Sequence, residues 1–169
     1  VVGTIMSNYG FEKSLKRHGI DLYRTQVGDR HVLEELRSRG WCLGGEPSGH
    51  IVCFDKTTTG DGIVAALQVL NAMVSTDTVL SLLTGDLDDY PQARANVALS
   101  LDRVGRSSVV SGARVQQMVS EVESLLGADG RVVVRCSGTE PVVRVMVEGS
   151  DGELVTRYCR QIAAAVADE

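Results

Sequence analysis

In the stretch VVVRCSGTEPVVRVMV, residues 132–147, two valine-rich runs stand on either side of a short loop. Branched side chains such as valine favour extended strands, and a loop that contains Gly138 and Pro141 is typical of a turn. The pattern therefore predicts two antiparallel strands joined as a β-hairpin. This hairpin sets the fold of the second half of the chain, which we predict to be built on an antiparallel sheet.

The loop of this hairpin carries groups that suit a phosphate. Ser137 and Thr139 supply hydroxyls, and Gly138 leaves the backbone N–H groups free to turn toward a ligand. Arg135 and Arg144 stand at the two ends of the loop, and a guanidinium can match two phosphate oxygens at once. We therefore predict an anion site at these five residues. The alternative is that Arg144 lies on an edge strand whose outer face meets water.

The composition is that of an ordinary globular protein with little capacity to bind nucleic acids. Of the 169 residues, 43% are hydrophobic, 23% charged and 4% aromatic, and the formal net charge is -5. The scarcity of aromatic side chains disfavours stacking on bases, and the negative charge disfavours nucleic acids and anionic membranes. No apolar run is long and uniform enough to span a membrane. We therefore expect neither nucleic acid nor membrane as a partner.

The cysteines and histidines show neither a disulfide framework nor a metal site. The four cysteines, at positions 42, 53, 136 and 159, include no CxxC pair, and the histidines at 18, 31 and 50 are dispersed. The sequence thus predicts a cytoplasmic protein with reduced cysteines and no metal-binding residue. Residues 1–5 form an apolar, strand-like start, from which we expect a piece of a longer protein.

The first half of the chain alternates predicted strands and helices, which is typical of an α/β domain. The expected strands cover residues 1–6, 20–25, 41–43 and 51–54, and the expected helices residues 11–18, 31–39 and 63–74. The helix at 63–74 is apolar around nearly its whole circumference, so we expect it to be buried against a sheet.

The second half predicts a small α+β domain with an antiparallel sheet and two helices. A strand is expected at residues 92–101, helices at 113–126 and 151–167, and the hairpin between these helices. An aspartate-rich linker near residues 85–89 separates the two halves. We therefore expect an α/β sugar-binding domain at residues 1–85 and an α+β phosphate-binding domain at residues 90–169.

A second candidate site is the loop between two expected strands, Gly44-Gly45-Glu46-Pro47-Ser48-Gly49-His50. Glu46 can accept hydrogen bonds from two neighbouring sugar hydroxyls, and Ser48 and His50 can bind the same ligand. The flanking glycines let a ligand approach the backbone closely. We interpret the loop as carbohydrate-binding, and the alternative is a turn with solvated polar tips.

A third loop, residues 26–30, opens a helix whose first N–H groups favour anions. Asp29 is expected to be the N-cap of that helix, and Arg30 to neutralise a ligand. Asp61 is expected to cap the helix at 63–74. The sequence shows no nucleophile with an adjacent base and orienting group, and no acidic run suited to Mg²⁺.

Taken together and in this order, the loops resemble those of the α-D-phosphohexomutases. Residues 44–50 resemble the family's sugar-binding loop, and residues 135–141 with Arg144 resemble its phosphate-binding loop. The stretches Asp55-Lys56-Thr57-Thr58-Thr59-Gly60-Asp61-Gly62 and Val27-Gly28-Asp29-Arg30 are similar to the bacterial phosphoglucosamine mutase branch. The resemblance extends along nearly the whole chain.

The resemblance implies a chain made of most of the third domain and all of the fourth domain of such an enzyme. In that family the first domain carries a phosphoserine, the second an Mg²⁺ site, the third reads sugar hydroxyls and the fourth closes over the substrate phosphate. The catalytic serine and the magnesium ligands would then lie outside this chain. The implied sugar-binding residues are Gly28, Asp29, Arg30, Glu46, Ser48 and His50, and the implied phosphate-binding residues are Arg135, Ser137, Gly138, Thr139 and Arg144.

The implied parent reaction interconverts the phosphosugars glucosamine 6-phosphate and glucosamine 1-phosphate through glucosamine 1,6-bisphosphate. The isolated chain is expected to be inactive. Two departures from the family pattern are Pro47, where an amide side chain is common, and Cys136, where lysine is often found. The alternatives are a fragment of a phosphomannomutase or phosphoglucomutase, and a stand-alone sugar-phosphate-binding module.

Overall fold

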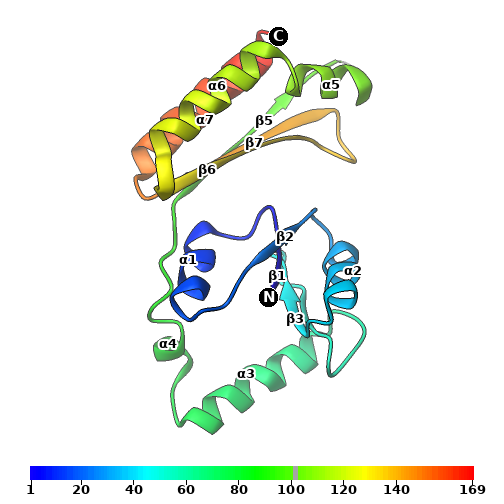
Figure 1. The fold of residues 1–169 in the computed structure, drawn as a ribbon. Coiled ribbons are helices and arrows are strands. Elements are labelled where there is room, and N and C mark those ends of the chain that lie inside the picture. Colours follow the sequence, from blue (N-terminus) through cyan, green and yellow to red (C-terminus); the bar gives the residue numbers. More distant parts are fainter. Residues whose placement is uncertain (101–102) are drawn as a thin grey trace. The chain divides into compact units, whose positions relative to one another are not determined.

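The computed structural model describes residues 1–100 and 103–169, and these divide into two compact units. Unit 1 covers Val1–Asp89 and unit 2 covers Tyr90–Glu169. Each unit has a sheet and a hydrophobic core of its own (Figure 1). Among the described residues, no helix combines the length and the apolar character needed to cross a membrane.

Unit 1 is an α/β unit with a mixed sheet in the strand order β2-β1-β3-β4. β1 pairs in parallel with β2 and β3, while β3 and β4 form an antiparallel pair. The strands are β1 Val2–Thr4, β2 Tyr23–Thr25, β3 Leu43–Gly45 and β4 Ile51–Cys53, and the helices are α1 Tyr9–Arg17, α2 Asp29–Arg39, α3 Gly62–Thr76 and α4 Leu80–Leu83. The predicted α/β class is confirmed, although each strand is shorter than expected or shifted within its run.

The core of unit 1 forms where α2 packs on the sheet. Val32 and Leu36 of α2 are fully buried together with Val2 of β1 and Val52 of β4. The packing is close because Gly44 has no side chain: a Cβ there would lie 2.7 Å from Cγ1 of Val32. Glycine at this position therefore lets the helix approach the strand that leads into the candidate sugar loop.

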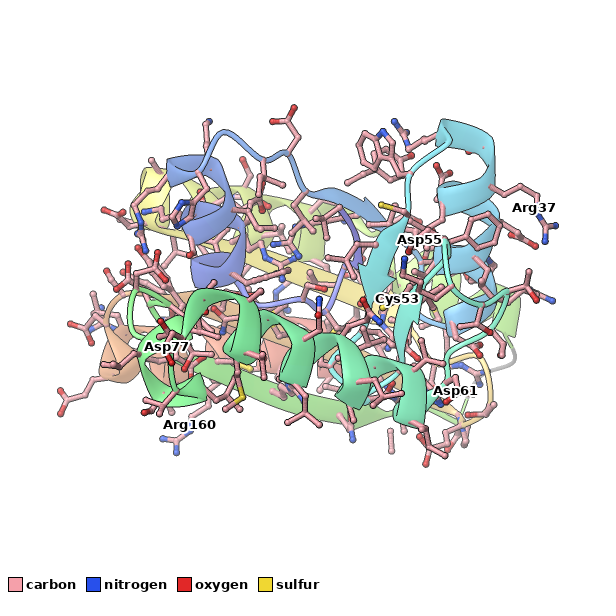
Figure 2. All side chains as sticks on the ribbon, turned by 90° about the horizontal axis from the view of Figure 1, so that it is seen from below. Arg37, Cys53, Asp55, Asp61, Asp77 and Arg160 are labelled. Atoms are coloured by element: carbon pink, nitrogen blue, oxygen red, sulfur yellow. The ribbon has the colours of Figure 1, made fainter. Side chains whose placement is uncertain are left out.

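The prediction that α3 is buried around its circumference is wrong. α3 begins after Asp61, whose side chain accepts hydrogen bonds from the N–H groups of Ile63 and Val64, so the predicted cap is correct. Ile63 and Val74 nevertheless keep 75% and 81% of their surface exposed, and no residue of α3 is buried among the described ones. The helix, seen between Asp61 and Asp77 in Figure 2, contacts β4 and α4, but apolar side chains such as Leu67 and Leu70 stay more than half exposed.

Unit 2 is the predicted α+β unit, with an antiparallel sheet in the order β5-β7-β6. Its elements are β5 Gln92–Ala98, α5 Arg103–Val110, α6 Ala113–Leu126, the 3-10 turn Gly127–Asp129, β6 Gly130–Cys136, β7 Val142–Gly149 and α7 Gly152–Ala167. The strand expected at residues 92–101 ends at Ala98, and Leu101 lies outside the described residues. The sequence did not predict α5.

The core of unit 2 lies between one face of this sheet and the helices α6 and α7 (Figure 1). β7 is the central strand, and Val143, Val145 and Val147 alternate along it with at most 1% of their surface exposed. Alternation with a period of two places these valines on the helix-covered face. The residues between them, including Arg144, therefore lie on the opposite face of the sheet.

Candidate phosphate and sugar sites

The predicted hairpin is present, and its register places the two arginines directly opposite each other. β6 and β7 pair so that Arg135 faces Arg144 and Cys136 faces Val143. The N–H of Ser137 donates to the carbonyl of Val142 at 2.9 Å, which closes the ladder just before the loop. Both guanidinium groups therefore stand at the edge of the loop that connects the strands, as the sequence pattern predicted.

The two guanidinium groups repel each other across this pair. Like charges directly opposite in a sheet are destabilising. Burial lowers the pKa of Arg135, and the charge of Arg144 lowers it further. Arg144 donates from Nη2 to a carboxylate oxygen of Glu140, so one of the two positive charges has an anionic partner. The pair therefore retains an excess of positive charge where the loop begins.

The loop itself is a tight turn with an exposed tip. Ser137 is 2% exposed, and its hydroxyl accepts a hydrogen bond from the N–H of Glu140 at 3.3 Å. The N–H of Val142 donates to the carbonyl of Glu140 at 2.8 Å. Gly138 and Thr139 are exposed. The structure thus places the Ser137 hydroxyl inside the turn, where it shapes the loop, and leaves the Gly138 and Thr139 groups open to a ligand.

In unit 1, three of the predicted sugar-site side chains meet in one cluster. His50 Nδ1 lies 3.1 Å from Oε1 of Glu46 and 2.9 Å from Oγ of Ser48. The other oxygen of Glu46 accepts a hydrogen bond from the N–H of Gly28 at 3.1 Å. The Glu46 side chain is 7% exposed, whereas that of His50 is 55% exposed. The carboxylate is thus fixed by both loops, and the imidazole projects outward.

This cluster does not have the geometry of a nucleophilic triad. In such a triad the base contacts the nucleophile with one ring nitrogen and the orienting carboxylate with the other. Here Ser48 and Glu46 both contact Nδ1 of His50, and Nε2 makes no hydrogen bond with the described residues. The arrangement fixes the imidazole through Nδ1 and does not activate the serine.

The expectation that Asp29 is the N-cap of α2 is wrong. The N-cap is Gly28, whose φ of 126° suits glycine, and Asp29 is the first helical residue. The carboxylate of Asp29 accepts a hydrogen bond from the N–H of Arg30 at 2.8 Å. The Arg30 side chain is 77% exposed and lies 3.9 Å from Glu34 on the same helix. Only Gly28 of this loop is joined to the Glu46 cluster by a hydrogen bond in the described chain.

The sheet topology explains why these loops converge. β1, β2 and β3 run parallel, so the loops that follow them leave the same edge of the sheet, which is where α/β units bind ligands. Arg24, which the sequence analysis did not single out, donates to the carbonyls of Thr4 and Ser7 and to Glu12. It holds the loop after β1 in place. The sequence feature that could have identified Arg24 is its position as a charged residue inside the short strand β2.

One family profile, described as phosphoglucomutase/phosphomannomutase, alpha/beta/alpha domain III, matches residues 1–90. A second, the C-terminal domain of the same family, matches residues 95–165. The chain belongs to the phosphoglucomutase/phosphomannomutase family. The resemblance to the α-D-phosphohexomutases is thereby confirmed, and so is the assignment of its two halves to the third and the C-terminal domain.

Curated members of the family agree along the whole chain. A phosphoglucosamine mutase of Thiobacillus denitrificans is 51% identical over 166 residues, and one of Vibrio vulnificus is 49% identical over 168 residues. These alignments cover 98% and 99% of this chain but 35% and 37% of the relatives. The chain therefore spans little more than a third of the length of the curated family members it matches.

Solved structures of this family share the fold at low identity. Aspergillus fumigatus N-acetylphosphoglucosamine mutase aligns with a TM-score of 0.83 and 18% identity, covering 99% of this chain and 38% of that one. The structure of the same enzyme in complex with GlcNAc-6P and magnesium aligns with a TM-score of 0.81. In this chain, residues 1–100 and 103–169 contain no group of three or more metal-binding side chains. The described residues therefore do not offer a site that fits a magnesium ion.

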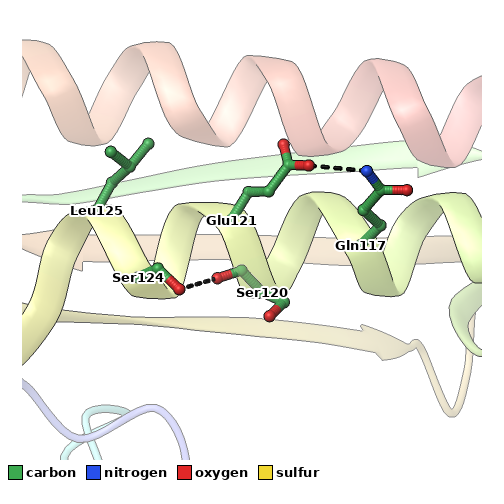
Figure 3. A pocket seen from close by; sticks show the side chains of 5 residues that line it. All are labelled: Gln117, Ser120, Glu121, Ser124 and Leu125. Carbon is green, nitrogen blue, oxygen red and sulfur yellow. Dashed lines mark hydrogen bonds between the residues drawn. The ribbon is translucent and has the colours of Figure 1, made fainter.

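A surface hollow beside α6 does not add a further site. It is lined by polar side chains of that one helix and by Leu125 (Figure 3). Gln117 donates to Glu121 at 2.9 Å, and Ser124 donates to the carbonyl of Ser120 at 2.8 Å. These groups satisfy one another within the helix. The hairpin loop and the Glu46 cluster therefore remain the candidate sites.

Proposed function

We propose that this chain supplies the sugar-binding and phosphate-binding parts of a phosphoglucosamine mutase. The parent enzyme would interconvert glucosamine 6-phosphate and glucosamine 1-phosphate through glucosamine 1,6-bisphosphate. The support is the identity of about half of all residues with phosphoglucosamine mutases, together with the two candidate sites. The magnesium site and the phosphoserine of the family would be contributed by residues outside this chain.

The observation that carries the proposal is the arginine pair of the hairpin. Arg135 and Arg144 face each other across β6 and β7, and Glu140 neutralises one of the two charges. A phosphate dianion would turn the repulsion between the guanidinium groups into two charge-assisted contacts. The exposed N–H groups of Gly138 and Thr139 would complete a concave anion site at the loop.

In unit 1 we assign the sugar to the Glu46 cluster. The Glu46 carboxylate is held by the Gly28 N–H and by His50, so it presents a fixed acceptor. His50 keeps Nε2 for a ligand, and Ser48 adds a hydroxyl beside it. Asp29 and Arg30 are at the start of α2, next to Gly28 in the chain, and would bind the outer part of the sugar. Binding and positioning are the main protein contributions to phosphoryl transfer.

The first experiment measures phosphate binding by the purified 169-residue chain. A titration with inorganic phosphate, followed by NMR, should shift the Gly138 and Thr139 amide signals. Arg144→Gln should weaken binding about tenfold or more, because a charge-assisted hydrogen bond contributes about 1.5–3 kcal/mol. Arg94→Gln is the matched control, since Arg94 is an exposed arginine on the neighbouring strand and is bonded to Gln92. Equal effects of the two variants would contradict the site.

The second experiment tests the sugar site and the lack of turnover. Glucosamine 6-phosphate should shift signals of residues 46–50, and Glu46→Gln should remove that response while the phosphate response stays. Glu35→Gln, a carboxylate of α2 that is paired with Arg39 on the same helix, is the control and should change neither. A coupled assay should show no mutase turnover by the chain alone. Measurable turnover would show that the chain carries its own phosphoryl acceptor.

A further inference from the structure

On the face of the unit 2 sheet that carries Arg144, two rows of polar side chains cross the three strands, and each row takes one residue from each strand. At the end far from the loop, Gln92, Glu148 and Arg131 lie side by side on β5, β7 and β6. Gln92 and Arg131 both donate to Oε2 of Glu148, at 3.2 Å and 2.5 Å. In this row a carboxamide, a carboxylate and a guanidinium are joined by hydrogen bonds across all three strands.

At the loop end, the corresponding row is Asn96, Arg144 and Arg135. The two rows are four positions apart along each strand, and an even offset places both rows on the same face. Here the carboxamide is not joined to its neighbour: the Asn96 side chain is exposed and makes no hydrogen bond with the described residues. The Nε of Arg144 is buried and also has no hydrogen-bond partner among them.

Two groups that could satisfy each other therefore face each other across β5 and β7. The Cα atoms of directly opposed residues in antiparallel strands lie about 4.5–5.5 Å apart, which is within reach of an asparagine and an arginine. A buried donor without a partner is costly, and asparagine is disfavoured within strands. Polar residues alternate with alanine and valine along β5, so Asn96 lies on the polar face of this strand, directly opposite Arg144.

We propose that Asn96 is a positioning residue for Arg144 when the hairpin binds phosphate, an inference that rests on the proposed phosphate site. In the free chain Arg144 is drawn toward Glu140 through Nη2. A phosphate seated at the loop and Arg135 would draw the Nη groups of Arg144 toward itself. The carboxamide oxygen of Asn96 would then accept from Nε and hold the guanidinium in that orientation. A neutral amide does this without adding a third charge to the arginine pair.

The test is a double-mutant cycle on phosphate affinity in the 169-residue chain, with inorganic phosphate as the probe. Asn96→Ala should weaken binding about two- to tenfold, the size expected for one hydrogen bond. Arg144→Lys keeps a positive charge but has no Nε donor, so in that background Asn96→Ala should have no further effect. The Asn96 side-chain NH₂ signals should shift on titration, and those of Asn71, exposed on α3, should not.

The possible outcomes separate this inference from the proposed function. If Asn96→Ala weakens binding equally in both backgrounds, Asn96 contacts the ligand itself and the positioning role is wrong. If the variant leaves affinity and the Asn96 signals unchanged while Arg144→Gln removes binding, the positioning role fails and the phosphate site stands. If the unmodified chain binds no phosphate, both fail. Asn96→Thr is the folding control, because threonine suits a strand and retains a hydrogen-bonding group.

Discussion

The two units differ in how much core supports the loops that they present. In the described part of unit 2, eleven buried residues form one cluster between the sheet and its helices, whereas unit 1 has a cluster of four. Unit 1 also leaves the apolar face of α3 exposed, and unit 2 buries six residues of α7. The phosphate-site hairpin is therefore supported by a large hydrophobic core, whereas the sugar-site loop is supported by a small one.

The largest expected effect comes from removing one core side chain in each unit. Leu36→Ala and Ile162→Ala both delete fully buried side chains, and each should cost about 2–5 kcal/mol. We expect unit 1 to lose its dispersed NMR signals in the first variant and unit 2 to remain folded in the second. The reverse result, a folded unit 1 in Leu36→Ala and an unfolded unit 2 in Ile162→Ala, would break the comparison.

A second test compares the opening of the two cores through their buried thiols. Burial raises the pKa of Cys53 in unit 1 and of Cys159 in unit 2, so each should react only after local opening. With Cys42 and Cys136 replaced by serine, a thiol reagent should label Cys53 about tenfold faster, or more, than Cys159. A tenfold ratio corresponds to a difference of about 1.4 kcal/mol between the free energies of opening of the two cores. Equal labelling rates would mean that the cores are equally stable.

The sequence predicted most of what local pattern controls. The two valine-rich runs predicted the hairpin of β6 and β7, and the alternation of strand and helix patterns predicted the α/β class of unit 1. The apolar pattern of a helix does not show which other element packs on it, and for this reason α3 was wrongly expected to be buried. α5 contains Gly105 and two serines, which are weak helix signals, and was not predicted.

The candidate sites were predicted at the level of residues but not of contacts. The loop compositions pointed to Glu46, His50, Arg135 and Arg144, and the hairpin spacing indicated that the arginines are neighbours. The pairing of Asn96 with Arg144 depends on the register between β5 and β7, which are separated by more than forty residues of chain and cannot be aligned from composition. The cap at Asp29 was misassigned because glycine can take the N-cap position without a side-chain bond.

A third test uses two helix caps with the same chemistry. Asp61 caps α3 and Asp151 caps α7, and each carboxylate accepts from two backbone N–H groups at 2.8–3.0 Å. Replacing either by Ala should cost about 1 kcal/mol. We expect hydrogen exchange to show fraying confined to α3 in the first variant. In the second, the whole of unit 2 should lose stability, because α7 is part of its core. Identical exchange patterns would contradict this difference.

The smallest expected effect is an acid-dependent one in unit 1. His18 Nε2 lies 2.7 Å from Oδ2 of Asp86, and this hydrogen bond lowers the pKa of Asp86. A lowered folded-state pKa adds stability above the ordinary aspartate pKa of about 3.9, and this stability is lost as the pH falls through the folded value. Asp86→Asn should therefore flatten the acid limb of unit 1 unfolding below about pH 4.

The control for that titration lies in unit 2. Asp168 pairs with Arg114 at 3.0 Å on the surface. Asp168→Asn should leave the acid unfolding of unit 1 unchanged when it is followed by NMR signals of residues 1–89. An effect of the same size from both variants would show that the acid limb reflects overall charge and not the His18 contact.

The central position of β7 has a consequence for the gene that encodes this chain. β7 is paired on both sides, with valines on the helix face and Arg144, Met146 and Glu148 on the other. One codon gained or lost within the strand would exchange these two faces downstream of the change, sending charged side chains into the core. Natural variation within β7 should therefore consist of substitutions and not of length changes.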